Sequence, residues 1–291
     1  MIQYRVYGIT VSSEIPLYNL PQTEGLPEAF IRYGKISYKH IPEGAENFYY
    51  SKRQVRFSTT REIFSITDGK QITIQPGADT DPHDLAAFIL GWGFAFLFPQ
   101  RGFSALHCTA LSIKGRGLLI SGISGSGKST TALSLIKRGY SYLTDDIAMV
   151  NPLTDDLLLP AYPLQKVCRD VALTLPEKQL LYINEERDKF ACLNEKDFCN
   201  TPVPLKTLVL LRPAEVSRVE AEEITGLDKF LRTLECLFLA EIYSHVGTPE
   251  EDKLRCLKLA EKLRVFVIKR PLTGNSLREV CDCVEKLSEL Q

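Results

Sequence analysis

Residues 118–150 read LLISGISGSGKSTTALSLIKRGYSYLTDDIAMV, and the interpretation of the whole chain starts from this stretch. An apolar run at 118–120 is followed by three closely spaced glycines, and residues 130–138 then show the apolar spacing of a helix. Residues 122–129, GISGSGKS, match the pattern G-x-x-x-x-G-K-[ST], which is typical of a phosphate-binding loop between a strand and a helix. The stretch therefore predicts a strand, a loop that cradles phosphates and a helix, in that order.

The fixed positions of this loop have defined chemical roles. Glycines let the backbone approach an anion and turn its N–H groups toward it. Lys128 supplies a positive charge for the β- and γ-phosphates, and Ser129 supplies a hydroxyl for Mg²⁺. A glycine-rich turn without a ligand is the alternative, which the flanking strand and helix disfavour. The predicted nucleotide-binding residues are Gly122, Ser124, Gly125, Ser126, Gly127, Lys128, Ser129 and Thr130.

A pair of acids follows the predicted helix. Residues 140–144 have strand character and end at Asp145 and Asp146, and Asp145 lies 17 residues after Lys128. Because strand ends of an open α/β sheet meet at one crevice, we expect these acids to face the phosphates from the adjacent strand. Phosphoryl transfer uses one carboxylate to hold Mg²⁺ and another to orient and deprotonate a hydroxyl. A solvated turn is the alternative, and the spacing from Lys128 favours the functional role.

Composition narrows the class of protein. The chain has 291 residues, 44% of them apolar, and a net charge of −1 from interspersed charges, so nucleic acid and membrane surfaces are not expected partners. The most apolar window, residues 85–98, is too short to span a bilayer, and the N-terminus lacks the pattern of a signal peptide. We therefore expect a cytoplasmic protein whose eight scattered cysteines are reduced thiols without zinc spacing.

The rest of the chain suggests two domains. Residues 1–80 contain short β-rich runs and predict a small β-rich N-terminal domain, and residues 81–291 predict a catalytic domain with a helical C-terminal part. A buried helix is expected from about Asp84 to Pro99. Residues 105–113 and 117–121 are expected to form a hairpin that leads into the phosphate loop and carries His107. A histidine in a strand is more often a packed residue than a catalytic one.

The middle of the chain, which includes the highly charged residues 184–189, offers cations that could neutralise a transferred phosphoryl group. The candidates are Lys166, Arg169, Arg187 and Lys189. Each of them alone is more often a solvated surface residue. Helices are expected at 227–243, 249–262 and 276–290, with a strand at 264–269.

With these elements placed, residues 106–150 resemble the catalytic domain of HPr kinase/phosphorylase. The shared features are a histidine-bearing strand, a G-x-S-G-x-G-K-S loop, an A-L-x-L-I-K-R-G helix and a D-D strand end; here they are His107, residues 122–129, residues 132–139 and Asp145-Asp146. The resemblance implies an α/β fold with a P-loop kinase core of the HPr kinase/phosphoenolpyruvate carboxykinase type. It implies Asp145 as the base toward a seryl hydroxyl, Asp146 with Ser129 as Mg²⁺ ligands, and His107 beside the reacting phosphate.

Two departures bear on the acceptor. The chain lacks a segment like L-G-I-R-G-L-G-I, and Thr130 stands where that family carries a glutamate. Both argue against HPr itself as the acceptor and against the reverse phosphorolysis. The overall layout resembles the HPr-kinase-like tailoring kinases of lasso-peptide systems, which implies a serine of a precursor peptide as the acceptor.

The functional prediction is a kinase that uses ATP or GTP with Mg²⁺ and transfers the γ-phosphate to a hydroxyl, a serine of a peptide or protein. Its catalytic residues would be Asp145, Lys128 and His107. Three alternatives stay open: a small-molecule hydroxyl kinase, a nucleotide-sensing ATPase without transfer, and a peptide-binding module with a vestigial loop. Pyrophosphate as a donor and a homo-oligomeric assembly are also left open.

Overall fold

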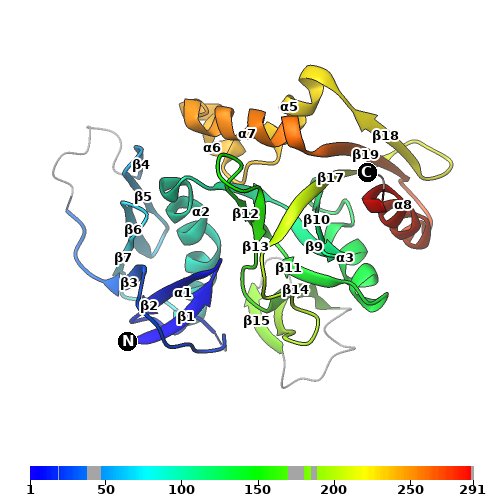
Figure 1. Cartoon of the computed structure of the whole chain (residues 1–291). Coiled ribbons are helices and arrows are strands. Elements are labelled where there is room, and N and C mark those ends of the chain that lie inside the picture. The colour runs from blue at the N-terminus through cyan, green and yellow to red at the C-terminus, as the bar shows by residue number, and fades with distance from the viewer. Residues whose placement is uncertain (19, 38–46, 170–179, 185–188, 290–291) are drawn as a thin grey trace. The chain divides into compact units, whose positions relative to one another are not determined.

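The computed structural model describes residues 1–18, 20–37, 47–169, 180–184 and 189–289 (Figure 1). By its internal contacts the chain divides into two compact units. The first comprises residues 1–103 and 167–193, and the second comprises residues 104–166 and 194–291. The predicted domain boundary after residue 80 stays a prediction, and the contacts place residues 81–103 with the β-rich unit. The mixed α/β structure with a β-rich N-terminal region agrees with the predicted fold class.

Both units contain many short strands. In chain order they are β1 (Ile2–Val6), β2 (Ile9–Ser13), β3 (Ala29–Tyr33), β4 (Phe48–Tyr50), β5 (Gln54–Ser58), β6 (Glu62–Thr67), β7 (Gln71–Pro76), β8 (Ser104–His107), β9 (Thr109–Ile113), β10 (Arg116–Ser121), β11 (Ser141–Thr144), β12 (Ile147–Val150), β13 (Leu157–Leu159), β14 (Leu164–Cys168), β15 (Leu180–Asn184), β16 (Lys189–Leu193), β17 (Val203–Ala214), β18 (Glu220–Ile224) and β19 (Arg264–Pro271).

The described helices fall into two groups along the chain. Before the second unit come α1 (Pro82–Phe88), the π-helix η1 (Ile89–Gly93), α2 (Phe94–Leu97) and the 3₁₀-helix η2 (Pro99–Arg101). Those of the second unit are α3 (Lys128–Lys137), α5 (Gly226–Glu235), α6 (Ala240–Val246), α7 (Glu250–Lys262) and α8 (Leu277–Glu289). Within the described residues, none of the helices has the length and apolar character needed to cross a membrane.

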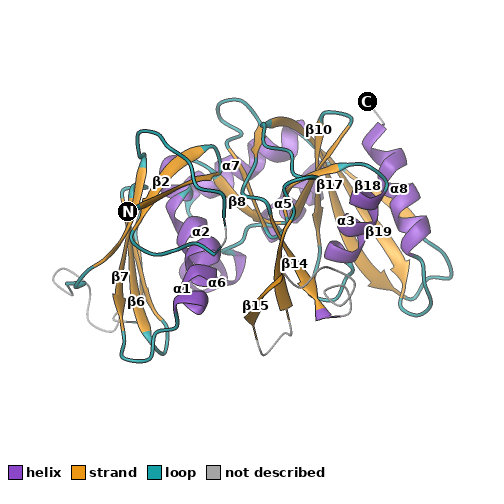
Figure 2. Ribbon diagram, turned by 90° about the horizontal axis from the view of Figure 1, so that it is seen from below, coloured by secondary structure: helices purple, strands orange, loops and turns teal. Residues whose placement is uncertain are grey.

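The first unit is built on a seven-stranded sheet in the order β1-β2-β3-β7-β6-β5-β4. A hairpin turn at residues 67–70, which carries an Asp-Gly pair, joins β6 to β7, with positive φ angles of 55° at Asp68 and 61° at Gly69. Helices α1 and α2 lie against this sheet (Figure 2). Aromatic side chains contribute to the packing, for example Phe64 on Phe88, whose ring centroids are 6.0 Å apart. The predicted helix therefore forms, although η1 interrupts it with a π-helical turn.

The second unit contains a nine-stranded sheet in which β10, β17 and β19 run parallel. The expected single strand at 105–113 is wrong. It breaks at Cys108, whose N–H donates to the carbonyl of Leu106 at 2.9 Å, so that β9 pairs with β10 while β8 pairs with β12. The tight turn at Cys108 thus sends the two halves of this segment to different parts of the sheet.

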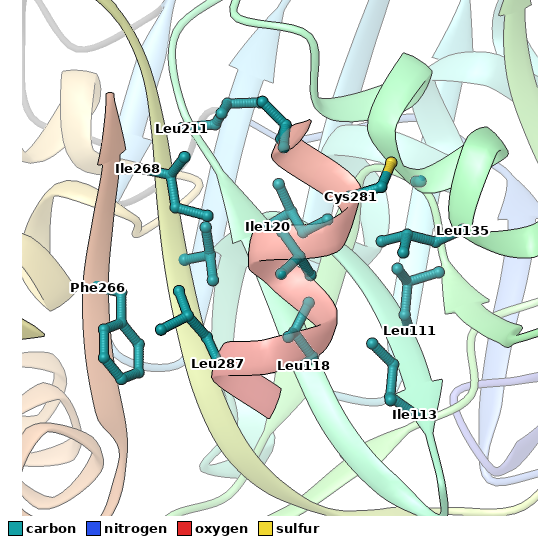
Figure 3. Packing of buried hydrophobic residues seen from close by; sticks show 14 of the residues in the cluster. Leu111, Ile113, Leu118, Ile120, Leu135, Leu211, Phe266, Ile268, Cys281 and Leu287 are labelled. Carbon is teal, nitrogen blue, oxygen red and sulfur yellow. The ribbon is translucent and has the colours of Figure 1, made fainter. Parts of the chain in front are cut away.

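Helices α3 and α8 pack together and cover one face of this sheet. On α8 the buried residues Val280, Cys281, Val284 and Leu287 recur at helical spacing. In Figure 3, Leu118 and Ile120 of β10 lie behind α8, and the sulfur of Cys281 points toward α3, where it donates to the carbonyl of Thr131 at 3.9 Å. This apolar layer holds the strand that precedes the glycine-rich loop and the helix that follows it.

The predicted helix at 227–243 is instead two helices, α5 and α6. The residues between them leave the helix because they pair with β8: the N–H of His107 donates to the carbonyl of Cys236 at 2.7 Å, and the N–H of Phe238 donates to that of Ala105 at 2.9 Å. Tertiary pairing therefore overrides the helical pattern here. The break between α5 and α6 fixes the backbone of His107.

Helices α6 and α7 are joined by a buried polar group. Tyr243 donates to Asp252 Oδ2 at 2.9 Å, Arg255 donates to Asp252 Oδ1, and both charged side chains are almost completely buried.

We expect Asp252→Ala to lower the free energy of unfolding by about 3–5 kcal/mol, because it leaves the Arg255 charge buried without its carboxylate. Chemical denaturation followed by circular dichroism measures this. Glu250→Ala, which breaks an exposed pair with Lys253 on the same helix, should cost about 1 kcal/mol or less. Equal losses in the two variants would contradict the prediction.

Candidate functional site

The glycine-rich loop, residues 122–127, connects β10 to α3 with a backbone that only glycine tolerates at its two ends. At Gly122 a Cβ atom would lie 2.4 Å from the carbonyl oxygen of Leu211 on the neighbouring strand β17. At Gly127 the φ angle is +102°, directly before the first residue of α3. The loop therefore runs tightly against the sheet and then turns sharply into the helix.

This loop has polar groups suited to an anion. Within the described residues, the backbone N–H groups of Ser124, Gly125 and Gly127 donate to no protein acceptor. The side chain of Lys128 folds back over the loop, with Nζ donating to the carbonyls of Gly122 at 2.6 Å and Ile123 at 3.4 Å. Amide donors and an ammonium group at a helix N-terminus are the groups that bind phosphate.

Arg270 on β19, which was not among the predicted site residues, binds the backbone of the loop. Arg270 Nε donates to the carbonyl of Ser126 at 2.8 Å, and its Nη2 donates to that of Gly125 at 3.1 Å. Arg270 ends an apolar strand that runs parallel to β17, so the carboxyl end of that strand lies at the edge of the loop. The sequence pattern that could have indicated Arg270 as a site residue is a basic residue near the end of an apolar strand. Arg212, near the end of β17, lies at the same edge and was also missed.

The acid pair lies at this edge too, although not on the adjacent strand as expected. Strand β9 separates β11 from β10, and since β9 is antiparallel to both, β11 and β10 end at the same edge. Thr109, the first residue of β9, pairs with Ile120 of β10 and donates from Oγ1 to the carbonyl of Asp145 at 2.8 Å. The acids therefore stand one strand away from the start of the glycine-rich loop.

Lys166 on β14 binds both acids. Its backbone N–H donates to Asp145 Oδ2 at 2.7 Å, and its Nζ forms an ion pair with Asp146 Oδ2 at 2.6 Å. His107 Nε2 lies 3.4 Å from the other oxygen of Asp146. Of the candidate cations of the sequence analysis, Lys166 lies at the acids. Arg187 lies outside the described residues.

The ionisation of Asp146 follows from these neighbours. Burial by itself would raise its pKa, but the charge of Lys166 and the hydrogen bonds from His107 and Lys166 outweigh burial and hold the pKa well below its usual range. Asp146 is therefore a carboxylate at any physiological pH. An ionised carboxylate with an exposed fraction of 34% can serve as a ligand for a hard cation.

His107 links the acid pair to the glycine-rich loop. Its carbonyl accepts a hydrogen bond from Ser121 Oγ at 3.1 Å, and Ser121 immediately precedes Gly122. Its ring is half-exposed and meets the ring of Phe238 edge-on, with centroids 5.9 Å apart. The structure thus brings His107, Asp145, Asp146 and the start of the loop to one edge of the sheet.

The described residues contain no group of three or more His, Cys, Asp or Glu side chains arranged to hold a metal ion. The predicted pair, Ser129 and Asp146, is a sparser donor set. Mg²⁺ commonly binds to such a small set of protein ligands, because water molecules and the phosphate oxygens of the substrate complete its coordination. The seven cysteines whose side chains are described are free thiols, as expected.

A prediction follows from the two contacts of Lys166. Lys166→Met keeps the backbone donor to Asp145 but removes the ammonium group from Asp146. We expect phosphoryl transfer to fall about 10–100-fold, the usual effect of losing a partner that orients a metal ligand. The half-saturating Mg²⁺ concentration should decrease, because no side-chain cation then competes for the carboxylate. Steady-state assays across a Mg²⁺ series measure both, with Lys206→Met on the exposed side of β17 as the control. Unchanged values in Lys166→Met would refute this role.

Residues 102–166 match the protein family described as the HPr Serine kinase C-terminal domain. This region contains His107, the glycine-rich loop, both acids and Lys166. The HPr kinase/phosphorylase of Lachnoclostridium phytofermentans is 33% identical over 101 residues, which are 33% of this chain and 32% of that protein. That of Clostridium perfringens strain SM101 is 47% identical over 53 residues, 18% of this chain and 17% of that protein.

The chain therefore spans about a third or less of the length of these curated relatives. A solved structure of the HPr(Ser) kinase/phosphatase from Coxiella burnetii aligns with 63% of this chain and 93% of that chain, at 14% identity and a TM-score of 0.30.

Proposed function

We propose that this protein is a kinase that uses a nucleoside triphosphate with Mg²⁺ and transfers the γ-phosphate to a hydroxyl group. The observation that carries the proposal is the gathering, at one sheet edge, of a glycine-rich loop with Lys128 and an acid pair with its own cation, Lys166. Phosphoryl transfer depends on positioning and on charge neutralisation, and these are the groups it uses. The local similarity to HPr kinase/phosphorylases supports the same reaction class. The core would be a P-loop kinase core of the HPr kinase/phosphoenolpyruvate carboxykinase type.

On the donor side, the loop would bind the phosphates. The N–H groups of Ser124, Gly125 and Gly127 would donate to phosphate oxygens, and Lys128 would move its ammonium group from the loop carbonyls to the β- and γ-phosphates. Ser129 and Asp146 would hold Mg²⁺, which when bound neutralises charge on these phosphates. Arg270 would keep the loop in shape through the carbonyls that it binds.

On the acceptor side, Asp145 would act as the base. The Lys166 N–H and the Thr109 hydroxyl fix its side chain and its backbone, respectively. In the reaction, the acceptor oxygen forms a bond to the γ-phosphorus while the bond from that phosphorus to the bridging oxygen breaks. The hydroxyl proton passes to Asp145, and the electron pair leaves with the nucleoside diphosphate. His107 would stand beside the transferred group, oriented by its contact with Asp146.

The acceptor that we propose is a serine of a peptide or protein, such as a precursor peptide of the lasso type. The experiment incubates the protein with γ-labelled ATP or GTP, Mg²⁺ and candidate serine peptides, and mass spectrometry locates the phosphate. Transfer to a serine supports the proposal. Nucleotide hydrolysis that no acceptor stimulates would favour an ATPase, and transfer only to small hydroxyl compounds would favour a small-molecule kinase.

A further inference from the structure

Helix α5 presents much of its apolar side to solvent. Its apolar residues recur at the three- and four-residue spacing of one helical stripe: Leu227, Phe230, Leu231 and Leu234. Such a stripe normally packs against a core, yet Leu227 is 71% exposed and Leu231 is 43% exposed. Phe230 and Leu234 are half-buried. These four side chains, which we call the α5 stripe, form an apolar surface of the kind that binds a partner.

The direction of α5 relates the stripe to the site edge of the sheet. The helix follows β18, whose last residue, Ile224, pairs with Val265 near the start of β19. At the other end of α5, Glu235 accepts a hydrogen bond from Arg212 Nη2 at 3.0 Å, and Arg212 lies at the edge that carries the glycine-rich loop. Helix α5 therefore runs from the opposite edge of the sheet toward the site edge.

The residues directly after α5 continue this path to the acid pair. The carbonyl of Cys236 accepts the N–H of His107 at 2.7 Å, and the ring of Phe238 meets the ring of His107 edge-on. His107 Nε2 in turn lies 3.4 Å from Asp146, the neighbour of the proposed base Asp145. A peptide that lies along the α5 stripe toward the carboxyl end of the helix is thus led to the acids.

We infer that the α5 stripe docks an apolar segment of the acceptor peptide. This inference rests on the proposed function and extends it to the recognition of the substrate. A second copy of the chain is a poorer occupant, because a stripe one helix wide is narrow beside the roughly 800 Å² that each partner buries in a standard interface. A small apolar contact suits a substrate that must leave after each turnover.

The length of α5 sets the position of this apolar segment relative to the serine. Leu227 lies eight residues before Glu235, which is about 12 Å along a helix that rises about 1.5 Å per residue. An extended peptide covers about 3.3 Å per residue, so it passes this length with about four residues. It must then also pass Phe238 and His107. We therefore expect apolar side chains that contact Leu227 to lie about four to seven residues from the serine.

A degenerate peptide library with one fixed serine tests the docking. The library is incubated with ATP or GTP, Mg²⁺ and either the wild type or Leu227→Asp, and mass spectrometry sequences the phosphorylated members. With the wild type, leucine and phenylalanine should be enriched about three- to tenfold at about four to seven residues on one side of the serine, as partial burial of an apolar side chain allows. Leu227→Asp should abolish this enrichment and still phosphorylate other members, which also shows that the variant is folded.

The matched control is Leu153→Asp, in the turn after β12, where Leu153 is 51% exposed. Strand β12 begins next to the acids and leads away from them, so this variant should keep the enrichment. Phosphorylated peptides without the enrichment, or an enrichment that Leu227→Asp retains, would overturn the docking surface and leave the kinase proposal intact. A library in which the wild type phosphorylates no member would overturn both the docking surface and the serine acceptor.

Discussion

Asp145→Asn is expected to reduce the rate of phosphoryl transfer by about 10²–10⁴-fold, the usual contribution of a general base. The amide of asparagine can still accept the Lys166 N–H that Asp145 Oδ2 accepts at 2.7 Å, so the local structure should persist. The variant cannot take up the proton of the acceptor. We therefore expect the loss in kcat, with the Kd for the nucleotide close to that of the wild type.

Rapid-quench measurement of transfer, together with calorimetry of nucleotide binding, separates these two quantities. Asp228→Asn, at an exposed position of α5 in the same unit, should behave as the wild type. A full transfer rate in Asp145→Asn would rule out Asp145 as the base. A loss of nucleotide binding in the variant would instead assign Asp145 to the donor side.

Lys128→Ala is expected to lower the transfer rate by about 10²–10³-fold, as the loss of one electrostatic donor to a developing charge does in other enzymes. Nucleotide affinity should fall as well, because the ammonium group would contact the phosphates before and during transfer. The loss of its hydrogen bonds to the Gly122 and Ile123 carbonyls should cost stability only about 1 kcal/mol.

Lys137→Ala provides the matched control, since Lys137 is exposed at the opposite end of α3. It should retain both affinity and rate. Thermal unfolding of the two variants shows whether a loss of activity arises from a loss of fold. If Lys128→Ala and Lys137→Ala have equal activities, the loop does not bind the transferred phosphate.

The sequence predicted those parts of the structure that local pattern determines. The strand before the loop, helix α3, strand β19 and helix α8 each follow from apolar spacing and flanking turns. The acid pair was also found at the end of a strand, because its position relative to Lys128 is fixed by a short connection. The catalytic role of these residues stays a prediction. The variants Asp145→Asn and Lys128→Ala test it.

The parts that were missed depend on pairing between distant segments. The turn at Cys108 separates β8 from β9, and the residues after α5 leave the helix to pair with β8. Arg270 is 142 residues from Lys128 in sequence and reaches the loop only because β19 runs parallel to β17. Lys166 was one of several scattered cations until β14 placed it at the acids. A local sequence pattern cannot indicate which residues that are far apart in the chain lie together in the fold.

We propose that the glycine-rich loop and the acid pair form a single phosphoryl-transfer site. The most direct test is the rate of phosphate transfer to a serine peptide by the double variant Lys128→Ala/Asp145→Asn, compared with both single variants. Residues that act on one transition state have strongly non-additive effects. We expect the double variant to be about as slow as the slower single variant. A rate reduced by the full product of the two single losses would contradict a shared site.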